Sequence, residues 1–319
     1  MGKEKEIARA LKEGGIIMPL FGTGCLLSTK EKEIVRLLGG AYRLISREKL
    51  PKEKISFVEL LNLPVVLIPE IEKPGWAVAP PGLPEAVVSQ IDEPVWFGIP
   101  EEPETLEDVI QTAGKWIKIN LNRKGSIGPG PTVLDFSAET PVVLRKGTLG
   151  VFELGRIIRR DVRLGPGVIL SILVVCTGNS CRSPLAAAFL AQACAGLPVI
   201  ITSAGVAAPV GNPATQFAIA VGKELGVDLT SHRARQLNRN MIEDADLILV
   251  MEEEQRRIIG EQLPGVEKKI RFLGGYPDRA EEIADPIGHS IEFYRSVAIL
   301  LKSGALRVAA NIKRLTTQK

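Results

Sequence analysis

The sequence predicts an α/β protein whose second half is a doubly wound parallel sheet and whose first half is an α+β domain. From residue 169 onward, short β-branched runs alternate with helical patterns, as in a parallel sheet covered on both faces. Before residue 160, helices and apolar strands follow in no regular order, and prolines interrupt the middle. Between the halves, Gly-Pro-Gly at 165–167 can continue neither kind of element, so residues 161–168 are expected to be a linker.

Length and composition allow two domains and argue against several classes of protein. A chain of 319 residues with a 45% hydrophobic fraction is ample for two cores. The net charge is +3 with both signs interspersed, so no charged segment predicts a nucleic-acid or membrane partner. Neither a signal peptide nor an apolar run of about eighteen residues occurs, which predicts a cytoplasmic protein. Four cysteines without a Cys/His cluster predict neither a disulfide framework nor a metal or cofactor site.

In the first half, hydrophobic periodicity and turn residues predict the elements in order. A charged amphipathic helix opens the chain, and helical patterns recur at 30–45, 104–114 and 151–159. Strands are expected at 14–20, among the prolines of the middle, and at 116–121, 132–136 and 141–145.

In the second half, strands and helices alternate cleanly. Strands are expected at 171–175, 199–205, 245–251 and 269–275. Helices are expected from Pro184, over 213–225, from Glu252 and from about Ile291.

Cys176 stands at the carboxyl end of the first of these strands, the edge at which open parallel sheets bind ligands. The small residues 177–181 let successive backbone N–H groups turn inward as an anion nest, backed by the positive end of the following helix. Arg182 adds a planar guanidinium that holds two phosphate oxygens at once. The same positive field favours the thiolate. The pattern predicts a nucleophilic sulfur facing a phosphate cradle.

A free cysteine taken alone is more often a small buried hydrophobe, and this is the alternative interpretation of Cys176. The pattern Cys-x5-Arg-Ser between a strand and a helix, with Gly178 in the loop and Pro184 in the first helical turn, favours the chemical role.

The second half resembles the low-molecular-weight protein tyrosine phosphatases, whose signature VCxGNxCRSP is matched by VCTGNSCRSP at 175–184. Further matching segments are SAG at 203–205, SHRARQL at 231–237, ADLILVM at 245–251 and DP at 285–286. The resemblance implies that residues 169–319 form a protein phosphatase domain that acts through a phosphocysteine intermediate, without a metal or cofactor.

The resemblance also implies a role for each matched residue. Cys176 attacks phosphorus, Arg182 stabilises the phosphoryl oxygens, and Asp285 protonates the leaving group and then activates water. His232 matches a histidine that braces the loop. The implied substrate-binding residues are Thr177, Gly178, Asn179, Ser180, Cys181 and Ser183.

Each of these residues also has a plainer interpretation. Asp285 before Pro286 is an ordinary turn initiator when taken alone, and His232 a solvated turn residue. Cys181 matches a position at which the family forms a reversible disulfide that protects the nucleophile from over-oxidation. Its alternative role is that of a loop filler.

The residues around the implied substrate slot leave two substrates open. Tyrosine-specific members of the family often carry aromatic residues after the Asp-Pro, whereas Ile287 and Gly288 follow here. Many tyrosine phosphatases have a branched apolar residue at the position of Ser180, whereas the arginine phosphatase branch has a small hydroxyl residue. The family as a whole implies a phosphotyrosine-type protein phosphatase, which is what we expect. These departures make protein arginine phosphatase the alternative. Arsenate reduction, another activity of the family, needs later cysteines to relay a disulfide. None follows Cys194, which argues against this activity.

The first half, residues 1–160, resembles a divergent YrdC-type domain, the fold of threonylcarbamoyl-AMP synthases. The resemblance is carried by NLNRKGSIGPGPTVLDFSAETPVVLRKGTL at 120–149. It implies pocket residues Arg47, Asn122 and Arg145, and contact with ATP or RNA. Several polar positions of the family are replaced here, so we expect a scaffold or a weak nucleotide or RNA binder, with synthase activity as the alternative.

Overall fold

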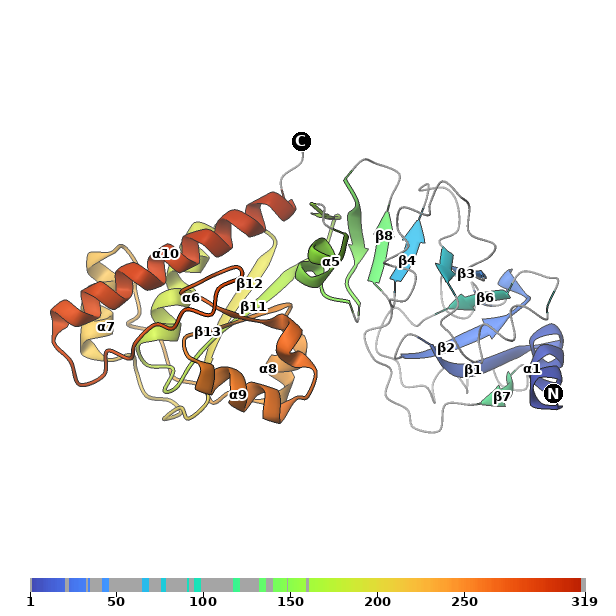
Figure 1. The fold of residues 1–319 in the computed structure, drawn as a ribbon, viewed down its shortest axis with the longest axis horizontal. Helices are drawn as coiled ribbons and strands as arrows, with labels where there is room; N and C mark the ends of the chain where they lie inside the picture. Colours follow the sequence, from blue (N-terminus) through green and yellow to red (C-terminus); the bar gives the residue numbers. More distant parts are fainter. Residues whose placement is uncertain are drawn as a thin grey trace. The chain divides into compact units, whose positions relative to one another are not determined.

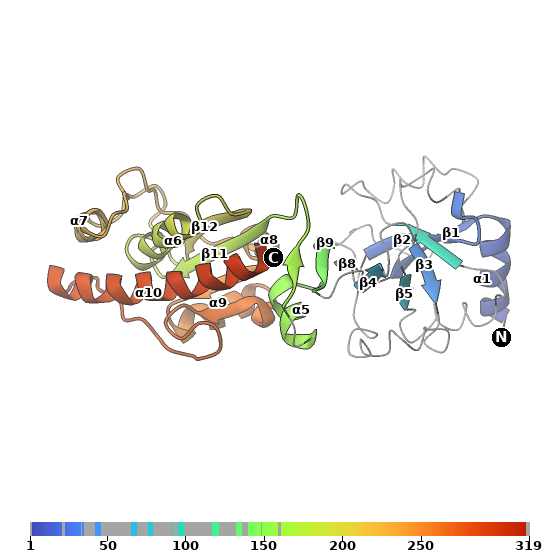
Figure 2. The same cartoon turned by 90° about the horizontal axis from the view of Figure 1, so that it is seen from above.

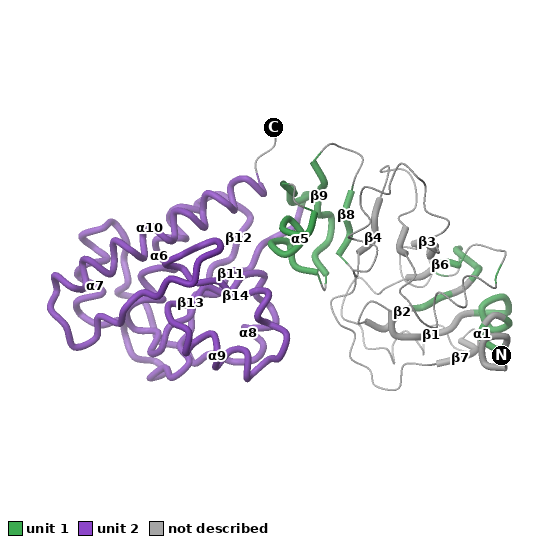
Figure 3. The backbone as a smooth tube through the Cα atoms, viewed as in Figure 1, with its two compact units in different colours: residues 1–166 green, residues 167–319 purple. Residues whose placement is uncertain are grey.

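The structure is a computed structural model, and it divides the chain into two compact units, residues 1–166 and 167–319, which are described separately (Figure 3). The residues that it describes are 2–20, 23–32, 34, 42–45, 65–68, 76–78, 91, 95–98, 117–120, 132–135, 140–147, 149–158 and 161–316.

The first unit contains a mixed ten-stranded sheet in the order β10-β9-β8-β4-β5-β3-β6-β2-β1-β7 (Figure 1). Its strands are β1 Gly15–Leu20, β2 Thr23–Ser28, β3 Tyr42–Ile45, β4 Val65–Ile68, β5 Trp76–Val78, β6 Val95–Gly98, β7 Ile117–Asn120, β8 Thr132–Asp135, β9 Val142–Arg145 and β10 Arg163–Leu164. Two of its helices are α1 Gly2–Glu13 and α5 Val151–Ile158.

Two expectations for this unit were wrong in part. The helical pattern over 30–45 ends in strand β3, which pairs with β5 and β6. Gly39 and Gly40 favour a break before this strand, because glycine is costly inside a helix. The expected linker 161–168 contains β10, which pairs in parallel with β9, and Val162 beside it is buried. The helix expected at 104–114 lies outside the described residues.

The second unit confirms the predicted parallel sheet, with strand order β12-β11-β13-β14 and all pairs parallel. Its strands are β11 Leu170–Cys176, β12 Val199–Gly205, β13 Leu247–Val250 and β14 Ile270–Phe272. Its helices are α6 Arg182–Ala193, α7 Gln216–Glu224, α8 Arg239–Asp244, α9 Glu253–Gln262, the 3-10 helix η4 Val266–Lys269 and α10 Ile291–Thr316.

Alternating side chains of the strands build cores on both faces of this sheet. Leu173 and Val175 of β11 pack with Ile242 of α8 and Ile259 of α9 in one buried cluster. The other face is covered by α6 and α10, which run side by side (Figures 1 and 2). No helix among the described residues is long and apolar enough to span a bilayer.

The strand order determines where a ligand site can form. Strand β12 pairs with one edge of β11, and β13, which comes later in the chain, pairs with the other edge. The carboxyl end of β11 is therefore the switch point at which open α/β sheets leave a crevice. The loop at 177–181 lies at this end.

Candidate active site

Residues 177–181 form a tight loop between β11 and the first turn of α6. Asn179 has a φ of 50°, a left-handed conformation that a short polar side chain tolerates. Three loop carbonyl groups point outward and accept backbone hydrogen bonds of 2.9–3.0 Å, namely Cys176 from Val206, Thr177 from Ala207 and Ser180 from Thr215. A trans peptide points its N–H opposite to its C=O. The N–H groups that follow these carbonyls therefore face the inside of the loop.

Strand β12 ends against this loop at Gly205, where no side chain fits. A Cβ at this position would lie 2.5 Å from the carbonyl oxygen of Thr177 and 2.8 Å from the nitrogen of Asn179. Both atoms belong to the backbone and cannot move aside as the end of a flexible side chain can. Glycine at 205 thus allows the backbone of β12 to support the loop directly.

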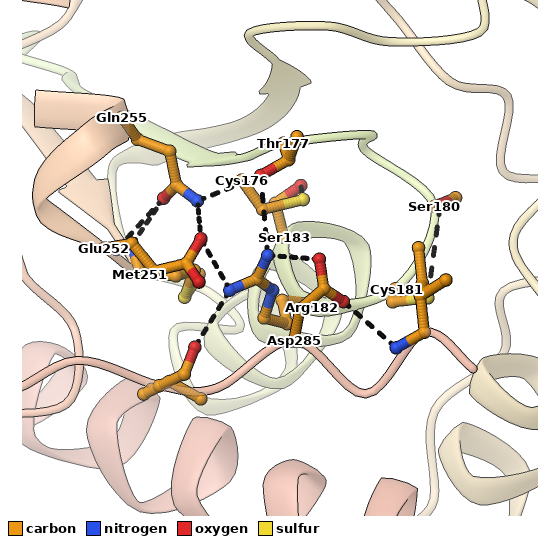
Figure 4. Close-up of polar contacts among 12 residues, drawn as sticks. Cys176, Thr177, Ser180, Cys181, Arg182, Ser183, Met251, Glu252, Gln255 and Asp285 are labelled. Carbon is orange, nitrogen blue, oxygen red and sulfur yellow. Dashed lines mark hydrogen bonds and ion pairs between the residues drawn. The ribbon is translucent and has the colours of Figure 1, made fainter. Parts of the chain in front are cut away.

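The Cys176 side chain lies at the base of the loop and is 3% exposed. The N–H of Asn179 donates to its sulfur over 3.2 Å. The Ser183 hydroxyl oxygen lies 3.0 Å from the sulfur, and both side chains are drawn in Figure 4. Asn179 Nδ2 donates to the same hydroxyl oxygen over 2.9 Å, so the Ser183 proton can point at the sulfur. Both groups can therefore donate to a thiolate, the nucleophilic form of cysteine.

Asn179 ties the loop to two other segments. Its Nδ2 donates to Ser203 Oγ over 2.9 Å, and its Oδ1 accepts the backbone N–H of Arg235, also over 2.9 Å. His232 Nε2 lies 2.7 Å from the Asn179 carbonyl oxygen, which can only accept, so this nitrogen carries a proton. Burial lowers the pKa of His232, the hydrogen bond to Asn179 raises it, and Arg235 and Arg233 lower it. The net direction is below the ordinary value of 6.5, which favours the neutral ring.

The Arg182 side chain is 1% exposed and joins three segments at the carboxyl edge of the sheet. Its Nη2 pairs with Asp285 Oδ2 at 2.5 Å and lies 3.5 Å from Thr177 Oγ1. Its Nη1 donates to the Ile283 carbonyl over 2.9 Å and pairs with Glu252 Oε2 at 2.9 Å. A buried guanidinium is thus fixed beside the loop with its charge matched by carboxylates.

Asp285 lies in the irregular segment between β14 and α10. Its Oδ1 accepts the N–H of Ile287 over 3.1 Å, which closes the turn that Asp-Pro predicts. The carboxylate is partly exposed and reaches the site through Arg182.

Ser180 and Cys181 lie on the side of the loop that faces α7 and α10. Cys181 Sγ lies 3.2 Å from Thr215 Oγ1 and 3.4 Å from the Tyr294 hydroxyl. Cys176 and Cys181 are both free thiols. Burial raises the pKa of Cys181, while the hydrogen bond from Thr215 offsets part of this rise.

Two residues of the site were not anticipated from the sequence. Glu252 precedes α9, and Gln255 in its first turn is fully buried. Gln255 Nε2 donates to Glu252 Oε2 over 2.7 Å and reaches Thr177 Oγ1 at 3.4 Å. The only sequence feature that points to them is their place directly after a buried strand, at the same edge as Cys176.

The predicted site residues of the second half thus come together. The loop from Cys176 to Ser183, Asp285 and His232 form one network. Of the pocket residues expected in the first half, Arg145 ends β9, while Arg47 and Asn122 lie outside the described residues. No cluster of His, Cys, Asp or Glu among the described residues can hold a metal ion.

Known proteins resemble this chain over its second half. The family model "Low molecular weight phosphotyrosine protein phosphatase" matches residues 171–318. A probable low molecular weight protein-tyrosine-phosphatase, EpsP of Ralstonia nicotianae, is 38% identical over 137 residues, 43% of this chain and 92% of its own length. The protein-arginine-phosphatase of Geobacillus stearothermophilus is 38% identical over 144 residues, 44% and 95% of the two lengths. The crystal structure of the Erwinia amylovora tyrosine phosphatase AmsI is 38% identical, covers 46% of this chain and 96% of its own, and has a TM-score of 0.42.

Proposed function

The chain belongs to the low-molecular-weight protein-tyrosine-phosphatase family and is a phosphatase, and on this premise we propose that its Cys176, Arg182 and Asp285 hydrolyse phosphorylated protein substrates. In the first step the Cys176 thiolate forms a bond to phosphorus while the bond to the leaving group breaks, and Asp285 gives the leaving group a proton. In the second step Asp285 takes a proton from water, which attacks phosphorus and releases inorganic phosphate and the thiolate.

One observation supports this proposal above the others. The Cys176 sulfur, the inward-facing N–H groups of its loop and the buried Arg182 guanidinium lie at one end of the parallel sheet. Fixed donors around a phosphoryl group stabilise the charge on its oxygens during transfer.

Substitution of the nucleophile tests the proposal. We expect Cys176→Ser to abolish hydrolysis of an aryl phosphate while the variant still binds inorganic phosphate. Cys194→Ser is the matched control, because Cys194 is also a buried free thiol but lies at the end of α6 away from the loop. Turnover by Cys176→Ser at the wild-type rate would refute the proposal.

We propose phosphotyrosine-type proteins as the substrate class, with phosphoarginine proteins as a second candidate that two features favour. The hydroxyl of Ser180 can hydrogen-bond a phosphoguanidinium group in the slot. The segment after Asp285 offers the exposed side chain of Ile287 and then Gly288, so it adds no aromatic wall. Both features weaken the packing that a phenyl ring needs.

The two candidates are separated by assaying phosphotyrosine and phosphoarginine peptides side by side. We expect Ser180→Ile to move the ratio of the two kcat/KM values toward phosphotyrosine. Ser296→Ile, on an exposed position of α10, is the control. An unchanged ratio in Ser180→Ile would contradict the role given to the slot.

For the first unit we propose a divergent YrdC-like domain that contacts ATP or RNA. The support is the sequence resemblance over 120–149 and the place of Arg145 at the end of β9. The test is saturable binding of ATP or tRNA that survives Cys176→Ser. Pyrophosphate release from ATP that depends on threonine would establish synthase activity, and the absence of both binding and release would refute the assignment.

A further inference from the structure

The Arg182 guanidinium has two carboxylate partners that are held in different ways. Glu252 Oε2 lies 2.9 Å from Nη1, and Asp285 Oδ2 lies 2.5 Å from Nη2. Apart from these, its partners are the neutral Ile283 carbonyl and Thr177 hydroxyl oxygens. The two carboxylates thus occupy opposite ends of the guanidinium fork (Figure 4).

Glu252 is anchored by the start of α9. Gln255 Nε2 donates to the same Oε2 over 2.7 Å. Gln255 Oε1 in turn accepts the backbone N–H groups of Met251 and Glu252 over 2.8 and 3.2 Å. Because Gln255 is fully buried, moving Glu252 away would break a capping box and leave buried polar groups without partners.

Asp285 is anchored less firmly and has conflicting tasks. Its side chain is 34% exposed, close to the 29% of Glu252, but among the described residues it accepts, besides Arg182, only a turn N–H from Ile287. In its pair with Arg182 it occupies Nη2, a donor that the phosphoryl oxygens need. A general acid must instead carry a proton and face the leaving group. Asp285 therefore has to leave Arg182 when a phosphoryl group enters.

We propose that Glu252 is a positioning residue that stays on Arg182 through the reaction, while Asp285 exchanges places with the phosphoryl oxygens. Glu252 holds the Nη1 end of the fork, so the opposite end is presented to phosphate in one orientation. It also offsets part of the charge of Arg182, which eases the release of Asp285. This inference rests on the proposed phosphatase function.

The test substitutions are Glu252→Gln, which keeps the shape and removes the charge, and Glu253→Gln as the control. Glu253 is the first residue of the same helix, but its side chain is 60% exposed and pairs with Arg256. In Glu252→Gln, Asp285 becomes the only carboxylate on Arg182, so its ion pair with the guanidinium is strengthened and its release is harder.

We expect kcat of Glu252→Gln for an aryl phosphate to fall about tenfold at pH 7.5. A fall of this size corresponds to the loss of one charged interaction in the transition state. Its inhibition constant for inorganic phosphate should not rise, so that the loss appears in kcat and not in phosphate binding. Mere loosening of the site would raise that constant as well. Glu253→Gln should match the wild type.

A kcat within twofold of the wild type in Glu252→Gln would overturn this inference and leave the proposed function intact. Absence of turnover in the wild type would overturn both. A crystal structure of the wild-type chain with inorganic phosphate tests the inference even if Glu252→Gln does not fold. We expect the pair Arg182–Glu252 to be retained and the pair Arg182–Asp285 to be broken, and the reverse would overturn the proposal.

Discussion

Asn179→Ala removes the side chain that ties the Cys176 loop to neighbouring segments, and we expect it to lower the unfolding free energy of the second unit by about 4 kcal/mol. The side chain makes three hydrogen bonds of 2.9 Å, to Ser183, Ser203 and the N–H of Arg235. Each contributes about 1 kcal/mol net when buried. Alanine at the φ of 50° adds about 1 kcal/mol of backbone strain.

Asn179→Gly separates the two contributions. Glycine loses the same hydrogen bonds but adopts a positive φ without strain. Its greater freedom in the unfolded chain offsets part of this advantage, so we expect it to be roughly 0.5–1 kcal/mol more stable than the alanine variant. Both variants should lose most of their kcat/KM, because the N–H of residue 179 no longer points reliably at the sulfur of Cys176.

Urea unfolding followed by circular dichroism measures the stability of each variant, and hydrolysis of an aryl phosphate measures activity. Tryptophan fluorescence is an internal control, because the three tryptophans, Trp76, Trp96 and Trp116, all belong to the first unit. The fluorescence transition should not shift. An alanine variant within 1 kcal/mol of the wild type would refute the hydrogen-bond argument, and a glycine variant no more stable than alanine would refute the strain argument.

Three further predictions follow from the same loop. Because burial lowers the pKa of His232 below its ordinary 6.5, the unfolded chain binds more protons, so the unfolding free energy should fall as pH drops from about 6.5 through the folded pKa. His232→Gln should flatten this part of a urea titration series, and an unchanged slope would contradict it. Gly205→Ala should abolish turnover, because its Cβ would meet loop backbone at 2.5 Å, whereas Gly260→Ala meets only a flexible glutamate oxygen at 3.2 Å and should stay active. Because burial raises the pKa of Cys181, mass spectrometry should show it alkylated by iodoacetamide far more slowly than a small thiol at pH 8, and equal rates would count against this environment.

The sequence was informative where the determinants of the site are local. The loop from Cys176 to Ser183 could be predicted because a strand, a run of small residues and a helix start stand next to one another in the chain. Its supports could not, because Ser203, Arg235 and Gln255 reach it only through the fold. Nothing in the pattern around Glu252 distinguishes it from its exposed neighbour Glu253.

The same division explains the fold. The alternation of the second half predicted its parallel sheet, because short β-branched strands are separated by helical patterns along the chain. Strand β3 was missed because Tyr42–Ile45 continues an apolar run whose periodicity also suits a helix. Pairing with β5 and β6 decides its conformation, and these partners lie tens of residues away.

The support of Asn179 by segments distant in sequence makes activity depend on their docking. Until β12 and residues 232–235 have docked, Asn179 lacks these partners and its N–H is not held against the Cys176 sulfur. A chain in which these segments have not docked should therefore be inactive. The rate at which activity recovers during refolding can accordingly measure the rate at which these segments dock.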